Sequence, residues 1–334
     1  MSFLFINGQI RAMESRLLNV NRLDRMIGAR TPDEAFRVLT ELEYAEFVDE
    51  GTTANDFYRI IEKGLYETKD LIVRGTGNHP GLQFLWRRAD VNNLKRAFKM
   101  KLLQKKTEIG TFSEENGFSS LGDINPKDIE KIVFTLKYPE DLPVEYIEAC
   151  ENASKVFEHK HEFRFVEFLF DKAHFSYLAK VARKAGSSFL KSWLELQIDA
   201  VNIRSLARSI LILDEKLSPE AFIEGGTFSW EKAHAAHNMD ILLRLTKETA
   251  FRELSSVLME HDSHEDKLLK IERECDRVQS LFLHDAQSGQ IDTIQVSMAY
   301  FERRLQNSRM LKFIMFAKFH GLSSENILKT LKHL

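Results

Sequence analysis

The chain has 334 residues, which is enough for two or three domains or for one elongated array of similar lobes. With 43% hydrophobic residues, 29% charged residues and a net charge of −3, the composition gives no global reason to expect a nucleic-acid partner. Only 15 glycines and 6 prolines interrupt the long periodic segments. These segments therefore predict helices, and we expect an all-α fold.

Four short stretches predict where helices begin. In "TPDE" (31–34) the threonine can cap the helix, the proline suits the first turn, and Glu34 can close a capping box. The stretches "NPKD" (125–128) and "SPE" (218–220) follow the same logic. After Gly321, "SSE" (323–325) predicts a last short helix.

The most irregular stretches divide the chain. They are residues 71–82, 107–126 and 213–229, and the last two are the natural boundaries. We therefore expect three similar helical lobes of about 105 residues, a length that matches the spacing of a phrase repeated along the chain. Their limits are 1–110, 111–213 and 214–334.

One phrase is written twice, in "RADVNNLKRAFKMKL" (88–102) and "LQIDAVNIRSLARSI" (196–210). Each copy reads Asp, two residues, Asn, a branched aliphatic residue and a base. The two asparagines lie 109 positions apart, and 105 positions further on Asn307 again precedes a base by two residues. The third copy has lost the acid. The repeat residues are Asp90, Asn93, Lys95, Asp199, Asn202, Arg204, Asn307 and Arg309.

The phrase favours a structural role over a ligand site. Asp and Asn three positions apart lie on one helical face. Asp near a helix start interacts favourably with the dipole, and Asn can bond the backbone of a neighbouring segment. The aliphatic residue would face the core, and the base would point to solvent or to an acidic partner. We interpret the phrase as a helix-docking motif inside each lobe.

Enzyme chemistry has weak signals. Gly75, Gly77 and Gly81 suggest a phosphate loop, but the segment lacks a Gly-Lys-Ser/Thr ending and a flanking strand. Histidine pairs with helical spacing occur in "HAAHNMD" (234–240) and "HDSHED" (261–266), without the carboxylate frame of a zinc site. We expect no catalytic residue, no cofactor and no metal.

Two cysteines, Cys150 and Cys275, have neither metal-site spacing nor the density of a secreted disulfide scaffold. Reduced thiols in a cytoplasmic protein are the expected state. The apolar start of six residues lacks the flanks of a signal peptide. No stretch of about 18 uncharged apolar residues exists, so any membrane role is expected to work through other proteins.

The densest unbalanced charge lies at 87–106, where eight bases face one acid. Such a stretch could meet lipid head groups, an acidic partner or nucleic acid, or it could be a solvated helix face that pairs with the acidic segment 111–155. Phe98 is its one central aromatic residue, which argues against a groove for single-stranded nucleic acid. We predict a partner interface at Lys95, Arg96, Lys99 and Lys101.

Almost the whole chain, from about residue 5 to 332, resembles a known family. "RAMESRLL", "ADVNNLK", "FDKAHFSYLAKVARKAGSSFLKSWLELQIDAVNIRSLAR" (170–208), "FIEGGTFSW" after Pro219, and the C-terminal "YFERRLQNSRMLKFIMFAKFHGLSSENILKTL" carry the likeness. They are similar to the family of C subunits of V-type ATPases and ATP synthases, whose eukaryotic member is called the d subunit. The third lobe departs from the family pattern, because Arg304 stands where the acid is expected.

This resemblance implies a funnel-like, pseudo-threefold protein at the cytoplasmic end of a rotor ring. Its expected partners are the membrane proteolipid subunits of the ring and the central-axle subunits, with no nucleic acid and with membrane association only through partners. It would carry torque for proton or sodium transport without catalysing a reaction itself. The alternative is a free-standing helical scaffold or adaptor. A metal- or nucleotide-dependent enzyme is a further alternative.

Overall fold

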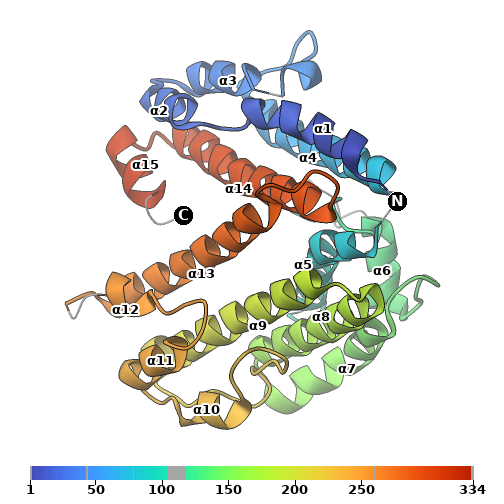
Figure 1. The fold of residues 1–334 in the computed structure, drawn as a ribbon, viewed down its shortest axis with the longest axis vertical. Coiled ribbons are helices and arrows are strands. Elements are labelled where there is room, and N and C mark those ends of the chain that lie inside the picture. The colour runs from blue at the N-terminus through green and yellow to red at the C-terminus, as the bar shows by residue number, and fades with distance from the viewer. Residues whose placement is uncertain (1, 43, 78, 104–116, 259–260, 332–334) are drawn as a thin grey trace. The chain divides into compact units, whose positions relative to one another are not determined.

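The computed structural model describes residues 2–42, 44–77, 79–103, 117–258 and 261–331. Over these residues the chain forms helices and loops without a strand, which confirms the all-α expectation (Figure 1). The helices gather into two compact units, Met1–His79 with Ser280–Leu334, and Pro80–Gln279. These units are groups of helices that contact one another, whereas the three expected lobes rest on a repeat in the sequence. The three lobes therefore stay a prediction. In the same ranges no helix combines the length and apolarity needed to cross a membrane.

The first unit joins the two ends of the chain. Its helices are α1 (Leu4–Met13), α2 (Val20–Gly28), α3 (Pro32–Thr40), α4 (Phe57–Thr76), α14 (Ile294–Phe319) and α15 (Ser324–Leu331). Helix α14 packs against α1, α3 and α4, and α15 packs against α2 (Figure 1). Leu39, Ile60 and Ile314 are fully buried at the centre of its core.

The second unit is built on long neighbouring helices. Its helices are α5 (Gln83–Leu102), α6 (Pro126–Thr135), α7 (Val144–Lys160), α8 (Phe163–Ala185), α9 (Ser188–Arg208), α10 (Trp230–Ala235), α11 (Met239–Thr246) and α12 (Leu254–Val257). Helix α8 packs against α5, α7 and α9 (Figure 1). The rings of Phe98 and Phe170 lie 5.4 Å apart in this core. Helix α13 (His264–Gln287) passes from this unit into the first.

Several helices begin where the sequence predicts, and the expected side chains cap two of them. Thr31 Oγ1 accepts a hydrogen bond from the amide of Glu34 at 3.1 Å, and α3 begins there with proline in its first turn. Asn125 caps α6 in the same way, through the amide of Lys127 at 2.9 Å. Helix α15 begins at Ser324, where the sequence predicts the last short helix.

The predicted helix start at 218–220 is wrong, because this stretch forms a turn. The Ser218 hydroxyl bonds the Glu220 carboxylate, and this carboxylate pairs with Lys160 of α7 at 2.8 Å. The carbonyl of Pro219 accepts a hydrogen bond from Lys172 of α8 at 2.9 Å. These side chains tie the turn to two helices, and such tertiary contacts override a local capping signal.

Of the predicted irregular stretches, one is partly wrong and another lies partly outside the described residues. Residues 71–76 continue α4, which ends only at Gly77, whose φ of +59° suits glycine. Residues 117–125 and 214–229 are turns and loops, as expected. The first part of the 107–126 stretch, up to 116, lies outside the described residues.

Candidate functional site

The first Asp-x-x-Asn phrase fastens the loop at 118–124 to α5. Asn93 Nδ2 donates to the carbonyl of Ser119 at 2.8 Å, and the amide of Ser119 donates back to Asn93 Oδ1 at 2.9 Å. One turn earlier, Asp90 Oδ1 accepts from the amide of Ile124 at 2.9 Å. Both side chains are buried. They therefore satisfy backbone groups of the loop that have no secondary structure to bond.

The second phrase does the same on α9 for the loop at 222–228. Asn202 Nδ2 donates to the carbonyl of Ile223 at 2.8 Å, and the Ile223 amide donates to Asn202 Oδ1 at 2.9 Å. Asp199 accepts from the Thr227 amide at 2.8 Å and from the Thr227 hydroxyl at 2.6 Å. Both aspartates sit well inside their helices, so they act on a loop and not on the dipole of a helix start.

The two loops share a phenylalanine and, four positions on, a glycine. Phe118 and Gly122 form the first pair, and Phe222 and Gly226 form the second. A Cβ at either glycine would overlap a carboxylate oxygen of the aspartate above it. We refer to each unit of Asp-x-x-Asn helix and Phe-x-x-x-Gly loop as a loop clamp.

The third phrase, on α14, is built differently. At the position of the acid stands Arg304, which is buried and donates to the carbonyl of Gly64 at 3.0 Å. Its guanidinium lies 5.2 Å from the centre of the Tyr44 ring. Burial lowers the pKa of Arg304 to about 9. Asn307 is half-buried and Arg309 is exposed, so a cation holds α14 against α4 where an acid holds a loop elsewhere.

Burial sets the electrostatics of the two clamps. It raises the pKa of Asp90 to about 6, although Arg87 donates to its Oδ2 at 3.0 Å. Burial also raises the pKa of Asp199, against the hydrogen bonds from Thr227. A buried carboxylate is stable only when its lone pairs are bonded, so the loop backbone and each aspartate depend on one another.

The base of each complete phrase pairs with an acid of the same unit. Lys95 Nζ lies 2.5 Å from Asp171 Oδ1 on α8, with only 18% of the lysine side chain exposed. Arg204 Nη2 lies 2.6 Å from Asp276 Oδ1 on α13. These two bases thus contribute to packing between helices within the unit.

The exposed members of the predicted interface lie over aromatic rings. The Arg96 guanidinium is 5.5 Å from the centre of the Phe118 ring, which belongs to the first clamped loop. The ammonium of Lys99 is 5.2 Å from the centre of the Phe163 ring. Both bases are exposed. Their charges therefore reach solvent, and contact with a partner stays a prediction.

Lys101 belongs to the same predicted interface and is more constrained. Its ammonium donates to the carbonyl of Val133 in α6 at 2.6 Å. In the same basic stretch, Arg87 lies 3.6 Å from Asp123, an acid of the 111–155 segment. Lys105 and Lys106 lie outside the described residues. Part of the basic charge is thus matched inside the unit, as the alternative interpretation expects.

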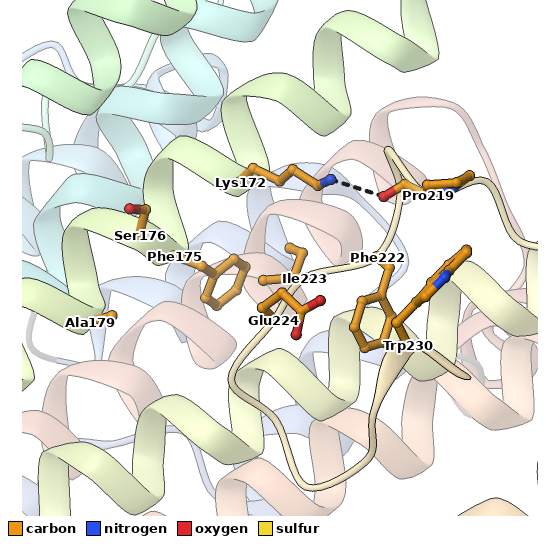
Figure 2. A pocket seen from close by; sticks show the side chains of 9 residues that line it. All are labelled: Lys172, Phe175, Ser176, Ala179, Pro219, Phe222, Ile223, Glu224 and Trp230. Carbon is orange, nitrogen blue, oxygen red and sulfur yellow. Dashed lines mark hydrogen bonds between the residues drawn. The ribbon is translucent and has the colours of Figure 1, made fainter. Parts of the chain in front are cut away.

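A cavity of about 500 Å³ opens beside the second clamped loop (Figure 2). Helix α8 forms one wall with side chains three and four positions apart, and the loop and Trp230 form the other. The Phe222 and Trp230 ring centres are 5.6 Å apart. The lining residues are Lys172, Phe175, Ser176, Ala179, Pro219, Phe222, Ile223, Glu224 and Trp230. This volume falls within the range of ligand pockets, and the second clamp positions one wall of it.

A smaller and more polar cavity of about 210 Å³ lies between α5, α8 and α9. His174 lines it, and its Nδ1 shares a hydrogen bond of 2.9 Å with the Tyr146 hydroxyl. Burial, together with the charges of Arg88 and Lys95, lowers the pKa of His174 to about 3. The imidazole is therefore neutral in the folded protein at ordinary pH.

The glycines of the suspected phosphate loop shape a helix and its end. A Cβ at Gly75 would lie 2.7 Å from side-chain atoms of Ile6, so Gly75 lets α4 and α1 approach closely. Gly77 terminates α4 in the left-handed conformation, and Gly81 is buried in a short 3₁₀ turn, Pro80–Leu82. These roles account for the glycines without a bound phosphate.

The suspected histidine sites are also occupied by other contacts. The ring of His234 lies 4.8 Å from that of Trp230, and His264 Nδ1 lies 2.8 Å from the carbonyl of Leu211. Within the described ranges, no group of three or more His, Cys, Asp or Glu side chains has metal-binding geometry. Cys150 and Cys275 are buried free thiols, and burial raises the pKa of each to about 12.

Sequence reasoning found the helical half of each clamp and missed the loop half. The signal was available, because "FSSLG" (118–122) and "FIEGG" (222–226) both place glycine four positions after phenylalanine. The cavity beside the second loop was missed as well. Its walls come from stretches about 45 residues apart, and no local pattern predicts that they meet.

Comparison with known proteins adds an independent finding. The model of the family described as ATP synthase (C/AC39) subunit matches residues 6–330. The chain is also 24% identical over 293 residues to the C subunit of the A-type ATP synthase of Thermococcus onnurineus (strain NA1). That alignment covers 82% of this chain and 75% of the relative.

Proposed function

Because the chain belongs to the ATP synthase (C/AC39) subunit family, we propose that it is a non-catalytic central-stalk component of a rotary V-type ATPase or ATP synthase. In this role it joins the proteolipid rotor ring to the central axle and transmits torque for proton or sodium transport. It works at the cytoplasmic face of the membrane and is held there by its partners. The observation that carries the proposal is the family match over residues 6–330.

The loop clamps support this role physically. A torque adaptor has to resist shear, and loops are ordinarily the segments that yield first. In the second unit the loops at 118–124 and 222–228 are bonded through their backbone to buried side chains of α5 and α9, and the second loop is bonded also through the Thr227 hydroxyl. Such fixed loops present a stiff surface to a partner without any chemistry of their own.

Assembly tests the proposal directly. The tagged chain is mixed with the detergent-solubilised proteolipid ring and with the purified axle subunits from the same organism, each alone and both together. We expect the chain to bind each one and to bridge ring and axle in a single complex. Binding to neither would overturn the proposal and favour a scaffold with other partners.

Coupling is the second part of the test. A complete complex reconstituted into vesicles is compared with one that lacks this chain. The expected result is that ATP hydrolysis by the head continues without the chain, whereas ion pumping stops until the chain is added back. Pumping without the chain would exclude a torque-carrying role. Running the assay with H⁺ and Na⁺ gradients also identifies the transported ion.

A further inference from the structure

The larger cavity of the second unit combines aromatic rings with a carboxylate. Phe175 of α8 faces the loop, and Phe222 and Trp230 stand together on the opposite wall (Figure 2). In this view the Glu224 carboxylate lies between the Phe175 and Phe222 rings. Glu224 is exposed, and across the residues that the structure describes it has no ion-pair partner within 4 Å. Aromatic faces next to a carboxylate are the surroundings that a cationic group prefers.

The base among the described lining residues is directed to the loop backbone. Lys172 Nζ donates to the carbonyl of Pro219 at 2.9 Å, at the edge of the cavity (Figure 2). Burial lowers the pKa of this ammonium, and Glu220 and Glu224 oppose the shift. Its charge is therefore partly matched by a carbonyl and by two acids before any ligand arrives.

The segment that forms the loop wall is acidic as a whole. From 214 to 231 it carries five acids and one base. Glu215 and Glu220 are already paired with Arg164 and Lys160, whereas Glu224 lines the cavity. Charge complementarity thus favours a basic occupant.

We propose that this cavity binds an arginine of a partner protein, together with an apolar side chain next to it in that partner's sequence. The planar guanidinium stacks on the Trp230 and Phe222 wall and pairs with Glu224. The apolar neighbour lies against Phe175 and Ala179, and the cavity of about 500 Å³ has room for both. The site lies within this chain, so it can be tested without ring or axle. A negative binding result and a failure of the proposed assembly are therefore distinguishable.

The experiment uses dipeptides as probes on the isolated full chain. N-acetyl-Arg-Leu-amide is titrated against N-acetyl-Gln-Leu-amide and N-acetyl-Glu-Leu-amide at constant ionic strength. Trp230 reports binding through its fluorescence and its indole N–H resonance, because Trp86 and Trp193 are buried. Trp230→Phe assigns the resonance. We expect saturable binding of the arginine probe, at least tenfold tighter than that of the glutamate probe.

Two variants locate the charge. Glu224→Gln should weaken the arginine probe about three- to fivefold, the range of a partly exposed ion pair. Glu231→Gln removes an equal charge from the same segment, outside the cavity lining, and should leave the affinity unchanged. Thermal melts show whether each variant is folded. Equal binding of all three probes, tighter binding of the glutamate probe, or no effect of Glu224→Gln would each overturn the proposal.

Discussion

The carboxylate of Asp199 occupies the space that a Cβ on residue 226 would need. Only glycine at this position lets the loop backbone come so close to the carboxylate. Its backbone does not adopt the left-handed conformation that usually explains a loop glycine. Asp90 and Gly122 repeat this relationship in the first clamp. A helix residue and a loop residue are thus matched in each copy, although they lie 27 and 32 positions apart in sequence.

The first prediction changes Gly226 to alanine. The added methyl group overlaps the Asp199 carboxylate, which has to move away from the Thr227 amide and hydroxyl that it accepts from. Overpacking of this kind typically costs about 1–3 kcal/mol. We expect a lower urea midpoint for the second unit and faster hydrogen exchange across 222–228.

Gly8 provides the matched control. It lies in the exposed part of α1, and a Cβ there meets nothing within 4 Å. Gly8→Ala should stabilise the helix by up to about 1 kcal/mol, since alanine has the higher helix propensity. A Gly226→Ala protein as stable as the unchanged chain would show that the clamp has room to relax.

The second prediction concerns Asn202. Its replacement by alanine leaves the amide and the carbonyl of Ile223 without their hydrogen-bond partner. Each buried polar group left unpaired in this way costs about 1–3 kcal/mol of stability. Asn202→Asp keeps an acceptor for the amide but cannot donate to the carbonyl, so we expect it to be destabilising too. Exchange of the Ile223 amide, followed by NMR, measures both effects.

The variant Asn307→Ala tests whether the third copy of the phrase acts as a clamp. Asn307 is half-buried and lies in a copy whose acid has been replaced by Arg304. We expect its replacement to change the free energy of unfolding by less than about 1 kcal/mol. If Asn307→Ala were as damaging as Asn202→Ala, the third copy would act as a clamp after all.

The sequence predicts helices well here because their periodic patterns and caps are local. Thr31 and Asn125 start helices where expected. The same kind of signal fails at Ser218, because its hydroxyl bonds Glu220 and the turn is held by Lys160 and Lys172 from distant helices. Local rules cannot see those partners.

The candidate sites show the same limit. The spacing of Asp199 and Asn202 indicates one helical face and a docking role, but it does not say what docks. The loop that they hold is 21–28 positions away, and its glycine becomes meaningful only once the carboxylate above it is seen. The exposed bases Arg96 and Lys99 are visible as charge in the sequence, whereas the rings beneath them are not.

The third prediction is a pH dependence set by His174. The pKa of this group is about 3 in the folded protein and 6.5 when exposed, so between these values the unfolded chain binds more protons. Stability therefore falls as the pH falls below 6.5, by about 1.4 kcal/mol per pH unit. His174→Gln should remove this contribution, so between pH 7 and pH 5 the unchanged chain loses about 2 kcal/mol more than the variant.

Comparison with the variant isolates this effect from Asp90, whose raised pKa acts in the opposite direction. The folded protein binds the proton of Asp90 more tightly, so that group adds stability as the pH falls. His159→Gln, on the exposed face of α7, is the control and should leave the slope unchanged. Parallel pH profiles for His174→Gln and the unchanged chain would refute the prediction.

The last prediction tests the basic face of α5 as a partner surface. Lys95 and Lys101 bond within the unit, so their reversal would disturb the fold as well as any contact. Arg96 and Lys99 are exposed, and their reversal to Glu in one chain should cost within about 1 kcal/mol of stability. We expect binding to ring or axle to weaken most at low salt, because charged interfaces act mainly through steering.

The control reverses two exposed lysines, Lys184 and Lys191, and should bind normally. Normal assembly and pumping by the Arg96→Glu, Lys99→Glu chain would place the interface elsewhere.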